Sequence, residues 1–251
     1  MIKLLEKVDL FSPKIITFEE ECGRDFTLFY DLKNQQILYL DLEELKYLLA
    51  ESVEELPNWE SHEKLSPPYR QKFDLEYVKR TNPRSASVMI LLYQNEFGEI
   101  EFPVTMRVSY EGAHSHQFSL PGGQFEEHDI SFDETAIRET VEELGVDYEN
   151  IEIIRQLSEM YIPPSNFLVY PYIGIYHGEP LFNPDEREVQ YVVPLNLEAF
   201  LNADYEVFER EFSGQVVEIP GYNIGDDEYL WGATAMILEE FKDYLKILLN
   251  L

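Results

Sequence analysis

The spacing of hydrophobic residues divides the chain into strands and helices. Short apolar or alternating runs predict strands, whereas apolar residues three and four positions apart predict helices. Strand pairs that close around residues 33–34 and 96–99 are expected to form hairpins. We expect strands at residues 14–19, 26–31, 36–40, 86–93, 100–107, 117–120, 152–157, 167–175, 189–193 and 215–219, and helices at residues 41–52, 134–144 and 231–249.

The order of these elements indicates the fold class and the division of the chain. Strands and helices that follow one another in this way predict a mixed α/β fold. Prolines, serine and asparagine within residues 57–68 predict a linker. We therefore divide the chain into an N-terminal α+β extension, residues 1–62, and a main domain, residues 63–251. For the extension, a homodimer contact and the binding of another partner are the two alternatives.

The helix near residue 140 is expected to carry its charges on one side. We expect Asp133 to be its N-cap and Gly145 to end it. One side should face a core and the other should present carboxylates. At about 100° per residue, the apolar side holds Ile137, Val141 and Leu144, and the opposite side holds Glu139, Glu142 and Glu143.

Such a cluster of carboxylates favours a divalent cation. Like charges one helical turn apart repel each other, and a bound Mg2+ or Mn2+ ion removes that repulsion because both ions prefer oxygen ligands. A solvated acidic helix face is the alternative for these glutamates taken alone. Just upstream, Pro121-Gly122-Gly123 predicts a turn whose bare backbone can approach a metal closely. Together the two features indicate a site for a divalent metal, and such ions often also hold substrate phosphates.

These segments resemble the signature of Nudix hydrolases, Gly-x5-Glu-x7-Arg-Glu-U-x-Glu-Glu-x-Gly-U, in which U is a bulky aliphatic residue. Gly123 begins the match, and residues 138–146 complete it. Asp129 stands where the first Glu belongs, one extra residue precedes Arg138, and Thr140 takes the first U position. The loop and its extra residue resemble the coenzyme A pyrophosphatase branch of the family.

The resemblance to this branch extends beyond the signature, over roughly residues 66–249. Residues 161–167 resemble its Tyr-Ile-Pro-x-Ser-Asn-Phe element, and residues 231–235 resemble the start of its last helix. The side chains that would contact substrate by this resemblance are Arg107, His114, Gln117, Ser165 and Asn166.

The resemblance also implies a fold and a set of catalytic roles. The fold would be a Nudix-type α/β/α sandwich with a mixed sheet. Arg138 would orient the glutamates through charge-assisted hydrogen bonds. The base that activates water would be Glu142 or Glu143 through a metal-bound water, or an acid of a later loop, where Glu188 ranks ahead of Glu186 because an apolar run follows it. The Mg2+ or Mn2+ ion would be held by Gly123, Glu139, Glu142 and Glu143.

The expected reaction is hydrolysis of the pyrophosphate in coenzyme A or one of its derivatives, which yields 4′-phosphopantetheine and adenosine 3′,5′-bisphosphate. Relatives in this branch often carry Arg where this chain has Glu111-Gly112. Another nucleoside diphosphate derivative, such as ADP-ribose or a dinucleoside polyphosphate, is therefore the first alternative. A non-catalytic nucleotide-binding domain is the second, and the intact glutamates argue against it.

Charge and composition narrow the partners. The chain has 49 acidic and 19 basic residues and a formal net charge of −30, which argues against nucleic acid and against an anionic membrane surface. Its apolar runs fall far short of the roughly 20 residues that cross a bilayer. The early charges after Met1 do not fit a secretory signal, and Cys22 is the single cysteine. We therefore expect a cytoplasmic protein that acts on a small-molecule nucleotide.

Overall fold

The computed structural model describes residues 18–19, 25–26, 28–31, 36–39, 41–68, 70–108, 117–212, 214–226 and 228–251. Near the N-terminus, β1 (Phe18–Glu19) pairs with β2 (Asp25–Phe26). The strand β3 (Leu28–Asp31) pairs antiparallel with β4 (Gln36–Tyr39), which confirms the predicted hairpin. Residues 14–17, 27 and 40 of the predicted strands lie outside the described residues.

A large mixed sheet forms the centre of the fold. Its main path runs in the order β10-β11-β5-β6-β12, and β9 pairs with β11. Neighbouring strands are antiparallel except β11 and β5, which run parallel. The strands are β5 (Arg84–Gln94), β6 (Ile100–Arg107), β9 (Ile151–Gln156), β10 (Met160–Ile162), β11 (Phe167–Tyr176) and β12 (Val189–Asn196).

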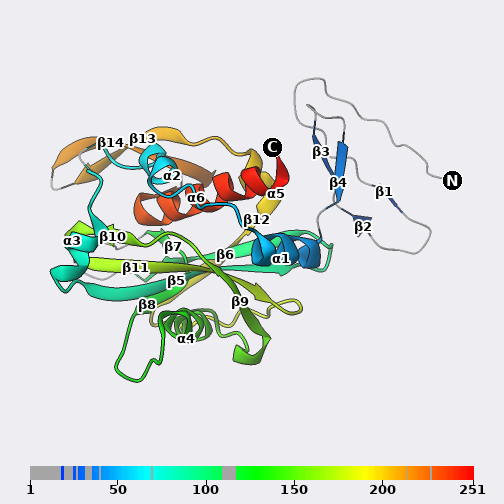
Figure 1. Cartoon of the computed structure of the whole chain (residues 1–251), viewed down its shortest axis with the longest axis horizontal. Helices are drawn as coiled ribbons and strands as arrows, with labels where there is room; N and C mark the ends of the chain where they lie inside the picture. The colour runs from blue at the N-terminus through cyan, green and yellow to red at the C-terminus, as the bar shows by residue number, and fades with distance from the viewer. Residues whose placement is uncertain are drawn as a thin grey trace.

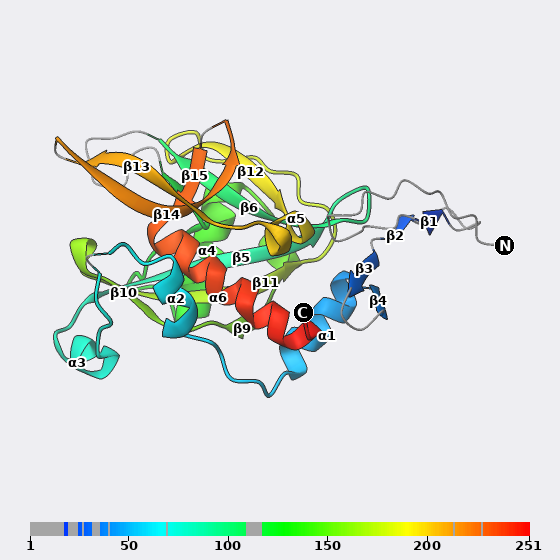
Figure 2. The same cartoon turned by 90° about the horizontal axis from the view of Figure 1, so that it is seen from above.

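Helices cover both faces of this sheet, as Figure 1 shows. The helix α4 (Phe132–Leu144) lies on one face, and α6 (Gly232–Leu249) runs obliquely across the other (Figure 2). Each face has its own hydrophobic cluster. The α6 side also carries α1 (Leu42–Glu51), α2 (Trp59–Lys64), α5 (Leu197–Asn202) and a second sheet of β13 (Glu206–Phe212), β14 (Gln215–Gly225) and β15 (Glu228–Trp231); the short α3 (Leu75–Arg80) precedes β5. The predicted α/β/α sandwich is confirmed.

The large sheet splits beside α4, and this split positions the glycine segment. The hairpin partners β5 and β6 pair only near their turn, at Tyr93 opposite Glu101 and Gln94 opposite Ile100. Farther along, β7 (Phe118–Ser119) pairs with β6, and β8 (Gly122–Gln124) pairs with β5. The prediction of a Pro-Gly-Gly turn was therefore wrong for the glycines, which lie in a strand because they must approach β5 closely.

The predicted linker, residues 57–68, contains the helix α2, which packs against α6. The carboxylate of Glu240 is fully buried and accepts hydrogen bonds from the Asn58 amide at 3.0 Å and the Ser158 amide at 3.2 Å. Its second oxygen also lies 3.2 Å from Nε2 of the buried His62. The α2 segment thus supplies hydrogen-bond partners, Asn58 and His62, to a buried carboxylate, and an extended linker would not hold both of them against it.

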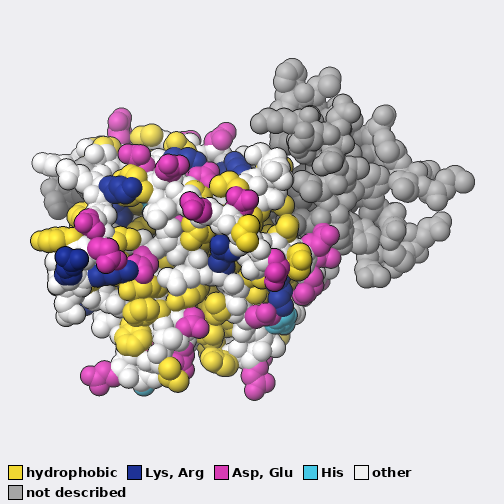
Figure 3. All heavy atoms as spheres, in the orientation of Figure 1, with side chains coloured by type: hydrophobic (Ala, Val, Ile, Leu, Met, Phe, Trp, Pro, Cys, Tyr) yellow, Lys and Arg dark blue, Asp and Glu magenta, His cyan; other side chains and the backbone are white. Residues whose placement is uncertain are grey.

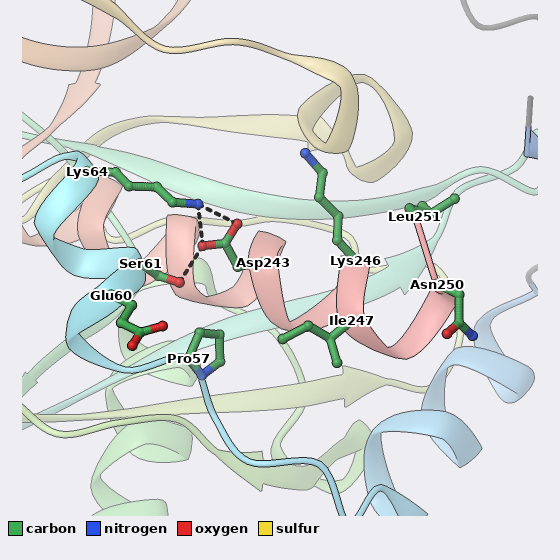
Figure 4. Close-up of a pocket in the computed structure, with 9 residues that line it drawn as sticks. All are labelled: Pro57, Glu60, Ser61, Lys64, Asp243, Lys246, Ile247, Asn250 and Leu251. Atoms are coloured by element: carbon green, nitrogen blue, oxygen red, sulfur yellow. Dashed lines mark hydrogen bonds and ion pairs between the residues drawn. The ribbon is translucent and has the colours of Figure 1, made fainter. Parts of the chain in front are cut away.

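A shallow pocket of about 530 Å3 lies between α2 and the end of α6. Figure 4 shows Asp243 bonded there to Lys64 and Ser61. The pocket contains none of the glutamates of α4, and its lining residues are Pro57, Glu60, Ser61, Lys64, Asp243, Lys246, Ile247, Asn250 and Leu251.

The surface mixes charged and apolar groups. On the face in Figure 3, the described Lys and Arg side chains are scattered among acidic and hydrophobic ones. None of the described helices is long and apolar enough to span a bilayer.

Candidate active site

The helix α4 begins two residues earlier than predicted. Its N-cap is Ser131, so Asp133 lies in the first turn, where the helix dipole stabilises its negative charge. Gly145 ends the helix in the left-handed conformation with φ 66°, as predicted, and its amide donates to the Val141 carbonyl at 2.9 Å. A Cβ at this position would lie 2.0 Å from the Asn183 carbonyl oxygen, so a side chain does not fit there.

The acidic side of α4 was predicted to lie opposite the core, but part of it is buried. The exposed fractions of the Glu143, Glu139 and Glu142 side chains are 1%, 12% and 58%. Thr140 is fully buried beside them and donates its hydroxyl to the Ala136 carbonyl at 2.7 Å, which lets it replace an aliphatic residue. The three carboxylates therefore differ in solvation, and Glu143 has lost most contact with water.

Glu143 lies between the end of β6 and the start of β8. One carboxylate oxygen accepts a hydrogen bond from Nη2 of Arg107 at 3.2 Å, and the other accepts from the Gly122 amide at 3.3 Å. Burial raises the pKa of Glu143 to about 7, and the negative charges of Glu139 and Glu188 add to the rise. Arg107 and the Gly122 amide oppose it. The group is thus poised to change its charge near neutral pH.

This pKa predicts a pH-dependent stability for the metal-free protein. Because the folded-state pKa of Glu143 lies above its ordinary value of 4.5, the folded state holds the proton more tightly, and the contribution is fully present below pH 4.5. It should fall by about 3 kcal/mol as the pH rises through about 7, at about 1.4 kcal/mol per pKa unit. Urea unfolding of the wild type and Glu143→Gln measures the difference in unfolding free energy against pH. A constant difference would contradict the assignment.

Glu139 lies directly over Gly123. A Cβ at Gly123 would be 2.4 Å from Cδ of Glu139, so a side chain there would push the carboxylate out of its present position. Burial raises the pKa of Glu139, while Arg138 opposes the rise and the charges of Glu142 and Glu188 add to it. The glycine segment and the helix therefore meet at a carboxylate that resists ionisation.

We expect Gly123→Ala to weaken the site through this one contact. The added methyl must displace the Glu139 carboxylate, and overpacking of this kind costs about 1–3 kcal/mol. The measurement is the unfolding free energy of Gly123→Ala, alone and combined with Glu139→Ala. In the double variant the cost should largely disappear, since the clashing carboxylate is gone. Equal costs in both backgrounds would place the strain elsewhere.

Asp129 and Arg138 tie the loop after β8 to the helix. The Asp129 carboxylate accepts from Nε and Nη2 of Arg138 at 2.8 and 3.0 Å, from the Glu126 amide at 2.9 Å and from the Thr135 hydroxyl at 2.8 Å. Its side chain is 1% exposed, and these donors, Arg138 foremost, hold the pKa of Asp129 well below its usual range. Nη1 of Arg138 also donates to Glu139 at 2.8 Å and Glu142 at 3.4 Å. Arg138 thus contacts two of the glutamates that it was predicted to orient.

The described residues fit a divalent cation in the chemistry of their donors. Glu139 and Glu143 are carboxylates whose pKa values are raised by burial. Because Gly123 has no side chain, the Glu139 carboxylate occupies the space beside its backbone. Oxygen donors of this kind suit Mg2+ and Mn2+. Among the described residues, however, three acidic, His or Cys side chains are not gathered into a ready metal cluster. Glu142 in particular points into solvent beside Arg138.

Glu188 lies at the start of β12, next to the end of β6. Val189 pairs with Arg107, and the Glu188 carbonyl accepts from the Val108 amide at 2.9 Å. Its carboxylate makes no hydrogen bond or ion pair within the described part of the chain, and its charge acts on both Glu139 and Glu143. A solvated acid is therefore available beside the buried ones.

The predicted substrate residues are not all brought together. Arg107 contacts Glu143, and Gln117 directly precedes β7 and has a partner of its own. His114 lies outside the described residues. Ser165 and Asn166 lie before β11, where the Ser165 carbonyl accepts from Arg84 and the Asn166 amide oxygen accepts from the Tyr161 hydroxyl. Neither residue contacts the glutamates of α4 in the described structure.

Sequence reasoning overlooked Thr135 in this arrangement. Its buried hydroxyl donates to Asp129 and also to the Ser131 carbonyl, so it joins the loop to the first turn of the helix. The available signal was a hydroxyl residue on the inward side of the first helical turn, which a periodic pattern treats as an ordinary polar position.

Comparison with known proteins identifies the family. A sequence model of the NUDIX domain matches residues 83–215, which include the split sheet, the glycine segment and α4. The chain belongs to the Nudix family. A solved structure of a MutT/nudix family protein from Enterococcus faecalis is 20% identical, covers 83% of this chain and 76% of that chain, and superposes with a TM-score of 0.44.

Two relatives from Arabidopsis thaliana carry Nudix hydrolase names. Nudix hydrolase 22, chloroplastic, is 34% identical over 171 residues, which are 63% of this chain and 54% of the relative. Nudix hydrolase 15, mitochondrial, is 36% identical over 165 residues, 63% of this chain and 58% of the relative. The chain thus spans little more than half the length of these Nudix relatives.

Proposed function

We propose that this Nudix chain is a divalent-metal-dependent pyrophosphohydrolase that cleaves coenzyme A or one of its derivatives. The observation that supports catalysis most strongly is Glu143, a buried carboxylate with a raised pKa that lies one helical turn from Glu139. A binding module would gain nothing from burying this charge, whereas a metal site gains strong ligands from it.

In the proposed reaction, Glu139 and Glu143 hold the Mg2+ or Mn2+ ion, with Gly123 and Glu142 alongside. The ion would neutralise phosphate oxygens and lower the pKa of bound water. Arg107 positions Glu143, and Arg138 positions Glu139, each through a hydrogen bond to the carboxylate. These contacts keep the carboxylates in place before substrate arrives, which is the main task of a protein that catalyses phosphoryl transfer.

Glu188 is the proposed base that takes the proton from the attacking water. Its carboxylate is exposed and unpaired among the described residues, so its proton can pass to solvent. Glu142 is the alternative base, because it is the most exposed of the three glutamates on α4. Glu188→Gln and Glu142→Gln separate the two, since loss of the base should flatten the acidic limb of the pH–rate profile.

Coenzyme A is favoured by the resemblance around Arg107, Gln117 and residues 161–167. Hydrolysis would release 4′-phosphopantetheine and adenosine 3′,5′-bisphosphate. Pure protein with Mg2+ or Mn2+ should be incubated with coenzyme A, ADP-ribose, NADH and diadenosine polyphosphates. Turnover of coenzyme A alone supports the proposal. Preferential turnover of another compound favours the alternative substrates, and binding without turnover favours a non-catalytic domain.

The remaining predictions concern partners and location. The proposal also includes a small nucleotide as substrate and a cytoplasmic location. It further includes a homodimer contact and no binding of nucleic acid. Sedimentation velocity measures the oligomeric state directly, and a monomer at micromolar concentration would count against a homodimer.

A further inference from the structure

The segment between β11 and β12, residues 177–188, carries the proposed base Glu188 and passes the end of α4. Hydrogen bonds hold both of its ends. At the start, the His177 amide donates to the Asn150 carbonyl at 2.8 Å, and at the finish the Glu188 carbonyl accepts from the Val108 amide at 2.9 Å. Contacts in its middle connect it to α4 and to β5, and these decide where Glu188 can lie.

The middle of the segment is attached to α4 through its backbone. The Asn183 amide donates at 2.8 Å to the carbonyl of Leu144, the last residue of the helix, where carbonyls lack a partner within the helix. A Cβ at Gly145 would lie 2.0 Å from the Asn183 carbonyl oxygen and 2.7 Å from its carbon, so the two backbones are in direct contact. Leu144 directly follows Glu143. The segment is therefore attached to the helix one residue beyond a proposed metal ligand.

The ring of Phe182 attaches the same part of the segment to β5. Its centroid lies 5.7 Å from that of Tyr93, with an angle of 76° between the planes. Tyr93 is buried, and its hydroxyl donates to Glu101 at 2.7 Å, so the ring that receives Phe182 is itself fixed. Phe182 packs against the hydrophobic cluster on the α4 side of the sheet, whereas its neighbour Leu181 is 86% exposed. Phe182 and Asn183 thus form a loop anchor in which Leu181 takes no part.

A compact turn joins the loop anchor to Glu188. The Asp185 carbonyl accepts from the amides of Glu188 and Val189, both at 2.9 Å. Its carboxylate accepts from the Arg187 amide, also at 2.9 Å. Pro184, the one residue between the loop anchor and this turn, has a φ fixed by its ring. The backbone from the anchor to Glu188 therefore has few free torsions, and a displacement of the anchor should move Glu188.

The loop anchor controls how close Glu188 lies to the glutamates of α4. The Glu188 carboxylate is near enough for its charge to add to the raised pKa values of Glu139 and Glu143. We propose that Phe182 is a positioning residue that holds Glu188 within reach of the attacking water. The proposal rests on the proposed function, because it requires Glu188 to be the base. Since a base must lie within hydrogen-bond reach of the proton that it takes, misplacement by about 1 Å slows the reaction.

A double-mutant cycle between Phe182 and Glu188 tests this role. Phe182→Ala removes the ring contact, Phe182→Leu keeps part of it, and Leu181→Ala is the matched control in the same segment. Steady-state kinetics use saturating Mg2+ or Mn2+ and the compound that the wild type hydrolyses fastest among coenzyme A, ADP-ribose, NADH and diadenosine polyphosphates.

Phe182→Ala should lower kcat about tenfold to hundredfold with little change in KM, because the base is misplaced while substrate contacts remain. Phe182→Leu should recover part of the loss, and Leu181→Ala should match the wild type. In the Glu188→Gln background, Phe182→Ala should cause no further loss, since no base remains to be positioned. A support for the fold alone would lower activity equally in both backgrounds.

Hydrogen exchange of the metal-free protein measures the same role without turnover. The amides of residues 185–189 should exchange faster in Phe182→Ala than in Leu181→Ala, while those of α4 stay protected. Unchanged exchange in residues 185–189 would overturn the loop anchor whether or not the protein is active.

The outcomes separate this inference from the proposed function. Equal losses from Phe182→Ala in the wild-type and Glu188→Gln backgrounds would overturn the positioning role and leave the base in place. Full activity in Glu188→Gln would overturn the proposed base, and the positioning role with it. If no compound is hydrolysed, the proposed function fails, and the exchange rates still decide whether Phe182 fixes the turn that carries Glu188. If Phe182→Ala does not fold, Phe182→Leu carries the cycle, and its smaller loss should likewise vanish in the Glu188→Gln background.

Discussion

The Glu143→Gln variant is expected to lose about 100- to 1,000-fold in kcat for metal-dependent hydrolysis, the range for removal of one electrostatic stabiliser. The amide keeps the shape of the side chain but can accept only one of the two hydrogen bonds, because Arg107 and the Gly122 amide donate to different carboxylate oxygens. It cannot supply the negative charge that holds the ion. Steady-state kinetics at saturating Mg2+ or Mn2+ measure the loss, and titration with Mn2+ measures the accompanying fall in metal affinity.

The same variant should gain stability when metal is absent. At pH 8 the wild type carries a buried charge at Glu143 that the amide does not, so the metal-free variant should melt at a higher temperature. The matched control is Glu96→Gln, an exposed acid in the β5–β6 turn, which should change neither property. Full activity in Glu143→Gln would remove Glu143 from the metal site.

The Asp129→Asn variant is expected to lose about 3–5 kcal/mol of unfolding free energy, because it leaves the largely buried Arg138 without its main partner. The amide also turns an NH2 group toward a carboxylate position that receives four donors. Urea unfolding at pH 7 measures the loss. The pKa of Asp129 is lower in the folded state than in the unfolded state. Its contribution to the unfolding free energy is therefore fully present at any pH above its ordinary pKa, which includes pH 7.

An exposed pair of the same type provides the control. Asp185 and Arg187 form an ion pair in which the arginine side chain is 85% exposed, so Asp185→Asn should cost far less unfolding free energy than Asp129→Asn. Adding Arg138→Met to Asp129→Asn should recover part of the larger loss, because no uncompensated charge then remains. If the two aspartate variants cost the same, burial does not explain the role of Asp129.

Long elements with strong periodicity could be predicted from the sequence. The strand β6 agrees at both ends with its expected range, and α6 begins one residue later than expected. The elements β13 and β15 were missed, although Gln215–Ile219 within β14 was expected. In β13 the glutamates alternate with Phe208 and Arg210, so its apolar side is too weak to stand out.

The candidate site was predictable in its residues but not in its burial. The spacing of the glutamates placed them on one side of a helix, and the structure agrees. The apolar side was predicted correctly in part, since Leu144 is fully buried and Ile137 packs against the core, but the buried face also includes Ala136, Thr140 and Glu143. Burial of Glu143 follows from that tertiary packing, and a single helix's pattern cannot report it.

The main hydrophobic cluster extends on both sides of the matched segment, residues 83–215. It includes Leu45 and Leu49 of α1 and Phe241 and Leu245 of α6. Without these helices, one whole face of the large sheet would meet water. The segment that matches the family model is therefore smaller than the portion of the chain that packs into one core. Exchange of the matched segment alone between relatives would transfer the candidate site without the helices that cover one face of its sheet.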